Sequence, residues 1–401
     1  MDPVAALEIG TSKIVAMVGE MREDGTVMIT GVGEHPSTGV RKGEIIDLEN
    51  ATVCAKSVLE TAEEASNVSV GQVFVTVSGG HIRGLVNRGA IPVRDREGLV
   101  SDDDVEEVME VARAVSLPAD REIIHTICRH FCVDDQSRVI KPEGMVGAKL
   151  SVDMLVLHGV RGLLRNTVRV VEQIPMEVQD VAFSGLCSSL SVLTVEQKTS
   201  GVVVIDLGGG TTDYMAYAGG VVACGGALGV GGDHITNDIA IAFNIPMARA
   251  EKLKKELGAA TTSSASEPAK ISLPAEVGFP GRTIHVCSMH TVINARLDEI
   301  FSMIKRRLDD DGVLPMVGAG VVLTGGGAHM KGVTNLAETV FGVPCFVGTP
   351  RGITGIAVAT DGPEYAACCG LIQYGFRVQD QSRSGQGSLL NTFMKTLLGR
   401  G

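Results

Sequence analysis

The chain has 401 residues, 44% of them hydrophobic, no tryptophan and a net charge of −12. This length exceeds one ordinary hydrophobic core and predicts at least two lobes, and the acidic charge argues against a nucleic-acid partner. No apolar run is long enough to span a bilayer, and no secretory leader is expected from the first residues. The nine cysteines lack metal-ligand spacing, so we expect buried, reduced thiols rather than disulfides.

The first eighty residues predict a strand–turn–strand unit, a helix and a further strand. Asp47 is a suitable helix N-cap, because its carboxylate can accept a hydrogen bond from an otherwise unpaired N–H of the first turn. The expected elements are strands at Val4–Ile9 and Ile14–Val18, a helix at Leu48–Ser66 and a strand at Val73–Ser78.

Between about residues 82 and 160 the pattern changes to that of a small α+β unit. Ser101 followed by three aspartates predicts a helix start, because a capping hydroxyl and an acidic first turn satisfy unpaired N–H groups. Strands are expected at Ile123–Cys128 and Leu150–His158. We interpret this region as a subdomain inserted into the first lobe.

The second half again alternates strands and helices, which indicates an α/β fold. A Ser-, Ala- and Pro-rich stretch predicts a surface loop at Thr261–Pro274. The expected helices are Gly162–Gln173, Gly231–Phe243, Pro246–Leu257 and Ile293–Leu308, and the expected strands are Val178–Phe183, Val202–Asp206, Thr211–Tyr217 and Val321–Leu323.

Three glycine-rich turns, each after a short apolar strand, carry the main functional signal. They read LEIGTSK from Leu7, IDLGGGTTD from Ile205 and LTGGGA from Leu323. Glycine lets a backbone approach a phosphate closely, and consecutive N–H groups form an anion-binding nest. The first two turns also share a preceding acid and following hydroxyls, so they form an imperfect repeat and predict a duplicated lobe.

Together these turns predict one nucleotide site, with two turns on the polyphosphate and the third on the adenosine. Lys13 is expected to add positive charge near the terminal phosphate, and acidic residues of the turns are expected to hold Mg²⁺ mostly through water. The candidate metal residues are Glu8, Asp206 and Asp213. The candidate nucleotide-binding residues are Gly10, Thr11, Ser12, Lys13, Gly208, Gly209, Gly210, Thr211, Thr212, Glu251, Lys254, Gly325, Gly326 and Gly327.

Two of these assignments have a plain alternative. Glu251 and Lys254 share a helix face, where they either grip the ribose or adenine or form an exposed ion pair between residues i and i+3. Gly10, taken alone, is also what an ordinary hairpin turn uses.

The end of the chain predicts a polar linker followed by an amphipathic helix. Residues 379–387 have almost no apolar content and are typical of a flexible linker. In residues 388–401 the apolar side chains share one helical face and the polar, cationic ones the other, which suits an anionic membrane surface. The alternative is a helix docked on the protein's own core. The candidate membrane-binding residues are Leu389, Leu390, Phe393, Met394, Lys395, Leu397 and Leu398.

The three turns resemble the two phosphate motifs and the adenosine motif of actin, Hsp70 and the sugar kinases. The segment Gly231–Lys254, the inserted unit and the tail extend this to a resemblance to the FtsA family of bacterial actin-like cell-division proteins, over essentially the whole chain. This implies an α/β, actin-like ATPase fold with two duplicated lobes, an inserted SHS2-type subdomain called 1C, and a C-terminal amphipathic helix. The implied boundaries are 1–82 and 161–199 for subdomain 1A, 83–160 for 1C, 200–228 and 317–378 for 2A, 229–316 for 2B, 379–387 for the linker and 388–401 for the membrane-targeting helix.

The resemblance also implies a function. A protein of this family binds ATP and Mg²⁺, polymerises with itself, and tethers the ring of FtsZ, the tubulin-like division protein, to the cytoplasmic face of the cell membrane at the division site. Arg296 and Arg282 are the implied contacts for the C-terminal peptide of FtsZ. The inserted subdomain is the implied surface for other division proteins.

Two positions depart from the pattern of relatives. The usual aspartate of the first turn is Glu8, and Phe183–Leu186 contains no carboxylate where chaperone relatives place a glutamate that orients the attacking water. General-base assistance is therefore not visible, and we expect at most slow ATP hydrolysis, with ATP acting as a conformational ligand. Two other functions stay open: a PilM-like pilus-assembly ATP binder, which would lack the terminal helix, and a small-molecule kinase, which would need a catalytic acid facing its substrate.

Overall fold

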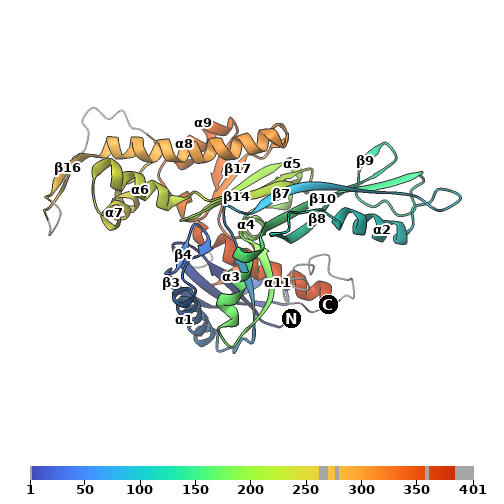
Figure 1. The fold of residues 1–401 in the computed structure, drawn as a ribbon, viewed down its shortest axis with the longest axis horizontal. Coiled ribbons are helices and arrows are strands. Elements are labelled where there is room, and N and C mark those ends of the chain that lie inside the picture. The colour runs from blue at the N-terminus through green and yellow to red at the C-terminus, as the bar shows by residue number, and fades with distance from the viewer. Residues whose placement is uncertain (1, 262–269, 276–279, 357–360, 384–401) are drawn as a thin grey trace.

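In the computed structural model the chain is an elongated molecule built around two central sheets of matching topology (Figure 1). The structure describes residues 2–261, 270–275, 280–356 and 361–383. Within these ranges, none of the helices has the length and apolar content that crossing a membrane requires.

The first central sheet has six strands in the order β11-β6-β1-β2-β3-β19. Alternate residues of a strand face opposite sides, so Ala5 and Leu7 pack toward helices α1 and α3 while Val4 and Ala6 pack toward helix α11. The sheet is therefore buried on both faces. Its elements are β1 (Val4–Ile9), β2 (Lys13–Met21), β3 (Val27–Pro36), β6 (Gln72–Val77), β11 (Glu177–Phe183), β19 (Ile353–Gly355), α1 (Leu48–Ser66), α3 (Arg161–Glu172), α4 (Ser184–Val192), α5 (Val195–Ser200) and α11 (Ala366–Arg383).

The second central sheet has five strands in the order β14-β13-β12-β17-β18. Here Val203 and Ile205 pack toward helices α6 and α8, while Val202 and Val204 face the core of the first lobe. Its elements are β12 (Val202–Leu207), β13 (Thr212–Ala218), β14 (Val221–Leu228), β17 (Val321–Thr324), β18 (Cys345–Val347), α6 (Gly232–Phe243), α7 (Met247–Leu257), α8 (Val286–Asp310) and α9 (Val333–Phe341).

The two sheets repeat one topology. In each, the first strand (β1 or β12) pairs antiparallel with the next strand in the chain and parallel with a later one (β6 or β17). The outer neighbours follow the same rule, since β3 and β14 are antiparallel and β11 and β18 are parallel to their partners. The duplication predicted from the two glycine-rich turns is confirmed.

A separate antiparallel sheet, β7-β10-β8-β9, follows directly after β6 and projects away from the lobes (Figure 1). Helix α2 covers one face of this sheet. It begins with a capping box, in which Ser101 Oγ accepts a hydrogen bond from Asp104 N and the Asp104 carboxylate accepts one from Ser101 N. The predicted α+β insertion is confirmed. Its elements are β7 (Arg83–Pro92), α2 (Asp102–Arg113), β8 (Arg121–Val133), β9 (Gln136–Val139) and β10 (Lys149–Val160).

Short elements complete the described chain. The Asp47 carboxylate accepts from Asn50 N at 3.1 Å, so the predicted cap of α1 is confirmed. The short elements are β4 (Val40–Arg41), β5 (Glu44–Ile45), β15 (Lys270–Leu273), β16 (Arg282–His285) and the 3₁₀ turns η1 (Leu314–Met316), η2 (Gly326–His329) and η3 (Pro363–Tyr365).

Two local expectations are wrong. The segment Thr261–Pro274, expected as a loop, contains β15, which pairs antiparallel with β16; local composition cannot reveal a partner later in the chain. The expected linker begins too early, because α11 continues to Arg383 and makes residues 379–383 helical. Gln and Arg are good helix formers, and a helix already nucleated against a core extends through them readily. The rest of the linker and the predicted membrane helix, 388–401, lie outside the described residues.

Candidate nucleotide site

The first two glycine-rich turns close in the same way. Gly10 N donates to Lys13 O at 3.1 Å between β1 and β2, and Gly208 N donates to Thr211 O at 3.0 Å between β12 and β13. In each turn one hydrogen bond is made inside the hairpin, and the remaining N–H groups of the turn are left near the space between the lobes. This is the arrangement expected of two anion-binding turns.

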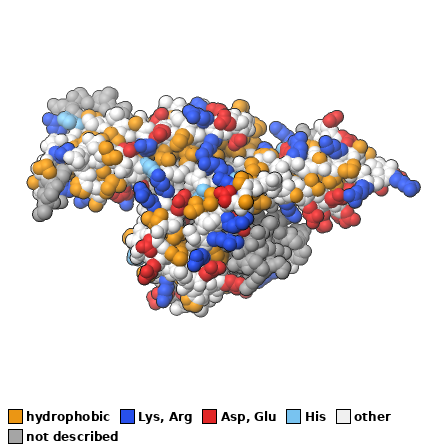
Figure 2. Space-filling view, in the orientation of Figure 1, with side chains coloured by type: hydrophobic (Ala, Val, Ile, Leu, Met, Phe, Trp, Pro, Cys, Tyr) orange, Lys and Arg blue, Asp and Glu red, His pale blue; other side chains and the backbone are white. Residues whose placement is uncertain are grey.

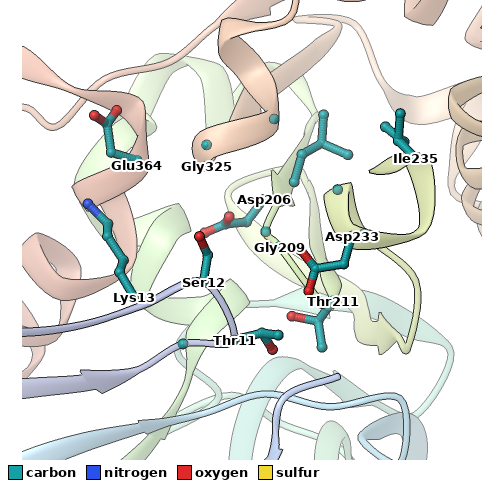
Figure 3. Close-up of a pocket in the computed structure, with 18 of the residues that line it drawn as sticks. Thr11, Ser12, Lys13, Asp206, Gly209, Thr211, Asp233, Ile235, Gly325 and Glu364 are labelled. Atoms are coloured by element: carbon teal, nitrogen blue, oxygen red, sulfur yellow. The ribbon is translucent and has the colours of Figure 1, made fainter. Parts of the chain in front are cut away.

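The three turns meet around one cavity of about 520 Å³. The first two turns touch: a Cβ on Gly210 would lie 2.4 Å from Thr11 Oγ1, and one on Gly209 would lie 3.0 Å from Ser12 Cβ. Figure 3 shows Thr11 and Ser12 of the first turn next to Gly209 and Thr211 of the second. All candidate nucleotide residues except Thr212 line the cavity, as do all three candidate metal residues.

The third turn forms the opposite wall. Gly325 has φ +79°, and a Cβ there would lie 2.2 Å from Asp206 Oδ1, so this position requires glycine to fit against the second turn. Gly326 differs, because a Cβ there would meet no described atom within 4 Å. The missing side chain at Gly326 therefore leaves space inside the cavity instead of relieving a contact in the protein.

Three carboxyl groups stand at the base of the cavity, and none of them forms an ion pair with a basic side chain of the described residues. Burial raises the pKa of Glu8 to about 8, helped by the nearby Asp206, and burial raises the pKa of Asp206 to about 6. Burial and the charge of Asp206 also raise the pKa of Asp213 well above its usual range. Glu8 Oε2 makes no hydrogen bond within the described structure. A cation near these groups would stabilise their ionised forms.

The described residues contain no cluster of three or more acidic, histidine or cysteine ligands arranged to bind a metal directly. A divalent ion held by phosphate oxygens and water needs no such cluster. The orphaned Glu8 oxygen and the raised pKa values of the acids fit an ion held mainly through water. Glu8, Asp206 and Asp213 would face its hydration shell.

Hydroxyl groups that the sequence reading missed hold two of these acids. Ser78 Oγ donates to the Asp213 carboxylate, with oxygen distances of 2.7 and 2.8 Å. Ser188 Oγ donates to Asp206 Oδ2 at 2.5 Å. Single serines give no recognisable motif, so only the glycine turn that follows Ser78, at Gly79 and Gly80, could have drawn attention to it.

Lys13 is held at the edge of the cavity. Its Nζ forms an ion pair with Glu34 Oε2 at 3.0 Å and lies 3.5 Å from the centre of the Tyr365 ring. In Figure 3 its side chain runs toward Glu364, away from Ser12. A phosphate would have to compete with Glu34 for this ammonium group.

Glu251 and Lys254 form the predicted i,i+3 ion pair, yet they also line the cavity. Lys254 Nζ lies 2.6 Å from Glu251 Oε2 and donates to Gly232 O at 3.0 Å, and its side chain is only 10% exposed. Thr236 joins the pair by donating to Glu251 and accepting from Lys254. The two alternatives are therefore compatible, although the pair is not the exposed one expected.

Other candidate residues lie elsewhere. The Thr212 hydroxyl is buried and donates to Val230 O at 2.8 Å, so it faces away from the cavity. Arg296 on α8 makes a two-pronged ion pair with Asp238 of α6, with distances of 2.6 and 3.0 Å. Arg282 Nη1 donates to Phe243 O at 2.6 Å. The candidate membrane residues lie outside the described part of the chain.

The start of α6 adds a wall that the sequence reading did not assign. Asp233 N donates to Gly209 O at 2.8 Å, which ties this helix to the second turn. The signal was the glycine pair Gly231–Gly232 before the helix. Further lining residues not predicted as site residues are Ile9, Gly43, Thr76, Ser184, Leu207, Ile235, Lys255, Gly258, Leu297, Ile300, His329, Met330, Lys331 and Glu364.

Comparisons with known proteins show the family to which the chain belongs. The family model described as "Cell division protein FtsA" matches residues 203–370, and that described as "SHS2 domain inserted in FTSA" matches residues 79–158. A cell division protein FtsA of Pseudomonas aeruginosa is 34% identical, with 95% of this chain and 91% of that protein covered. The chain belongs to the FtsA family. An FtsA of Escherichia coli K12 is 33% identical, with 93% and 90% covered.

Solved structures agree with this FtsA-family assignment at the level of fold. The PilM–PilN type IV pilus biogenesis complex aligns with a TM-score of 0.64 at 16% identity, covering 93% of this chain and 98% of that one. MreB5 of Spiroplasma citri bound to ADP aligns with a TM-score of 0.56 at 14% identity, covering 96% and 99%. The fold is actin-like, with an SHS2 domain inserted in the first lobe.

Proposed function

We propose that this cell-division protein binds ATP with Mg²⁺ between its lobes, assembles into polymers, and tethers FtsZ to the cytoplasmic face of the membrane at the division site. The observation that carries the nucleotide part is the meeting of three glycine-rich turns at one cavity. The related MreB5 structure bound to ADP supports a nucleotide in this fold. The membrane part rests on the sequence pattern of residues 388–401.

We expect ATP to act as a conformational ligand. The first turn belongs to one lobe and the second and third to the other, so a bound polyphosphate would stabilise one arrangement of the two lobes. No carboxylate of the Phe183–Leu186 segment is available to orient water, although Ser184 lines the cavity. Rapid Mg²⁺-dependent ATP hydrolysis by the pure chain would contradict this part.

Vesicle co-sedimentation tests the membrane part. The full chain should pellet with vesicles containing anionic lipid, and a chain stopped after Gly387 should not. Phe393→Asp should abolish pelleting because it places charge on the apolar helical face, whereas Asn391→Asp, the matched control on the polar face, should retain most of it. Equal pelleting of the full and shortened chains would mean that the tail packs on the protein.

Self-assembly should couple to membrane binding. One such helix binds weakly, whereas several helices on one polymer bind strongly through their high effective concentration. Pelleting should therefore rise steeply with protein concentration, and with ATP if ATP favours the polymer. Membrane affinity that is independent of protein concentration would contradict the coupling.

The FtsZ part of the proposal places the C-terminal peptide of FtsZ against α8 and its neighbours. Arg296→Glu should weaken that peptide at least tenfold, while Arg306→Glu, an exposed arginine of the same helix, is the matched charge control. Because Arg296 already pairs with Asp238, Asp238→Asn alone, which breaks this pair and keeps Arg296, separates loss of the pair from loss of a peptide contact. Unchanged peptide affinity in Arg296→Glu would remove the residue from the interface.

A further inference from the structure

Arginine side chains from different parts of the fold gather where the inserted domain meets the second lobe. Arg83 begins β7, Arg121 begins β8, and Arg307 lies near the end of α8. Arg83 Nη1 and Arg307 Nη1 donate to the same oxygen, Ala227 O, at 3.3 and 3.0 Å. Figure 2 shows basic side chains gathered near the middle of the molecule, where Figure 1 places the junction of β7 and β14.

Arg121 joins this group through the inserted domain. Its Nη1 donates to His81 O at 3.1 Å and contacts His158 Nδ1 at 2.9 Å. Burial, and then the charges of Arg307 and Arg121, hold the pKa of Arg83 below its usual value. The three guanidinium groups are therefore close enough to repel one another.

No ion pair offsets this repulsion within the described residues, and an acid at the same helix end, Asp311, acts on Tyr214 beside Arg307. Elsewhere in the described chain arginines pair with acids, as Arg88 does with Asp153 at 2.5 Å and Arg94 with Glu107 at 2.6 Å. Within the described ranges, none of the three junction arginines has an acidic group within the 4.0 Å of an ion pair. In a chain with a net charge of −12 this is a local excess of positive charge.

The junction also keeps hydrogen-bond donors available. In the described structure every side-chain hydrogen bond that Arg83 and Arg121 donate leaves from Nη1, so the edge formed by Nε and Nη2 is unused. That edge presents two parallel N–H groups, which match two oxygens of one oxyanion. Arg83 is exposed and Arg121 and Arg307 are partly exposed, so an ion from solvent can reach them.

Two neighbouring histidines add no charge to the junction. Burial and the adjacent arginines lower the pKa of His81 and of His158 to about 4, so both rings are neutral at pH 7. His81 Nδ1 accepts from Val160 N at 3.2 Å, which leaves its proton on Nε2. The excess charge at the junction therefore comes from the arginines alone.

We propose that Arg83, Arg121 and Arg307 form a second anion site, which binds a phosphate-type dianion at the junction of the inserted domain and the second lobe. Three positive charges favour a dianion over the single charge of a carboxylate. None of these arginines lines the nucleotide cavity, so the site is separate from it. Because Arg307 belongs to the second lobe and Arg121 to the inserted domain, a bound dianion holds those two parts in one arrangement.

Calorimetric titration of the full chain with inorganic phosphate tests this site. The nucleotide cavity is first saturated with a non-hydrolysable ATP analogue, and ionic strength is held constant with chloride. Arg83→Gln and Arg307→Gln should each weaken phosphate at least tenfold. Arg94→Gln, which removes an arginine of the same domain from an ordinary ion pair, should leave phosphate affinity unchanged.

Two additions to the titration, a second ligand and two lysine variants, ensure that every result supports or contradicts the site. Glycerol 3-phosphate in place of inorganic phosphate shows whether a phosphomonoester is the preferred source of the dianion, and binding of either one supports the site. Arg83→Lys and Arg307→Lys preserve the charge if a glutamine variant fails to fold, and Arg83→Lys should still weaken binding because its paired N–H edge is lost. Absence of binding by both ligands, or equal binding by wild type and all four variants, would overturn the proposal.

The test does not depend on nucleotide binding. If the ATP analogue does not bind, the same titration on the free chain still compares the junction variants with Arg94→Gln. Phosphate bound in the nucleotide cavity would be insensitive to Arg83→Gln, and that result would count against the second site.

Discussion

The two central sheets share a strand order but differ at the turn that faces the cavity. In the second hairpin Asp206 lies opposite Asp213 in the strand register, whereas in the first hairpin Glu8 lies opposite Val15. The two hairpins therefore share their backbone pairing but differ in the side chains that stand before the glycine turn. One turn carries a pair of acids, and the other carries a single acid against an apolar partner.

The two turns also differ in how their acids are supported. Both aspartates of the second turn accept hydrogen bonds from serines outside their own sheet, Ser188 on α4 and Ser78 after β6. Glu8 Oε2 has no such partner in the described structure. Serines of the first lobe thus position the acids of the second lobe. The two duplicated halves therefore form one site together and are not two independent phosphate-binding turns.

The largest effect is expected where the first glycine-rich turn contacts the second, at Gly210. Gly210→Ala should push Thr11 and Lys42 away from position 210, because its Cβ would lie 2.4 Å from Thr11 Oγ1 and 2.8 Å from Lys42 Cα. We expect the free energy of unfolding to fall by about 1–3 kcal/mol and ATP affinity to fall by about a hundredfold or more. Chemical denaturation and nucleotide titration measure the two effects.

Gly326→Ala is the matched control for that experiment. Its Cβ would meet no described atom, so the free energy of unfolding should change by less than about 0.5 kcal/mol while ATP affinity falls. Equal ATP affinity in Gly326→Ala and wild type would show that the adenosine does not use the third turn.

A buried acid should make strand β11 of the first sheet more pH-sensitive than the matching strand β18 of the second sheet. Burial raises the pKa of Asp180 on β11 from 3.8 to about 6, while the matching strand β18 has no acidic residue. A folded-state pKa above the unfolded one means that stability is lost as pH rises from 3.8 to about 6. Asp180→Asn should therefore be more stable than wild type at pH 7, by roughly 1–3 kcal/mol.

Thermal or urea unfolding across pH 3.5 to 8 (about the range in which carboxyl groups change charge) measures this difference. The advantage of Asp180→Asn should vanish at the acidic end, where the wild-type carboxyl is already protonated. Glu177→Gln, an exposed position on the same strand, should show no such pattern. A constant difference between Asp180→Asn and wild type at all pH values would contradict the prediction.

Loss of the serine hydrogen bonds to the acids of the second turn should lower the free energy of unfolding by less than Gly210→Ala does. Ser78→Ala removes the bonds to Asp213 and a 3.0 Å bond to Thr211, and should lower the free energy of unfolding by about 1 kcal/mol. Ser37→Ala is the control, because Ser37 Oγ is buried without a partner in the described structure. If both variants lose the same stability in urea, the cross-lobe bonds have no special role.

The cation of the first turn should matter least for stability. Lys13→Met removes a partly exposed ion pair with Glu34, so the free energy of unfolding should fall by no more than about 1 kcal/mol. ATP affinity should fall more if Lys13 turns toward phosphate in the bound state. Lys56→Met, from the exposed pair with Glu60, is the control for both readouts. Unchanged ATP affinity would assign Lys13 to Glu34 alone.

Local patterns predicted much of the architecture correctly. The hairpins around the first two turns, the Asp47 cap and the Ser101 capping box all depend on residues within a few positions of one another. Such features can be read from sequence because propensity, capping and period act locally. Several strands were not predicted, among them the long strands β3 and β14 and the short strands β18 and β19. Strand β19 is short and gains its stability from β3, a partner far away in the chain.

The sequence by itself determined the glycine turns, the acids that precede them and the repeat of strand, turn and strand around the first two turns, because these follow from local backbone chemistry and repetition. Only the tertiary structure decided that Ser78 and Ser188 hold the acids of the second turn, and that Arg83 and Arg307 meet at one carbonyl oxygen. Such contacts join residues that are separated by 18 positions or more. No local rule specifies them, because they exist only when the packed lobes bring their side chains together.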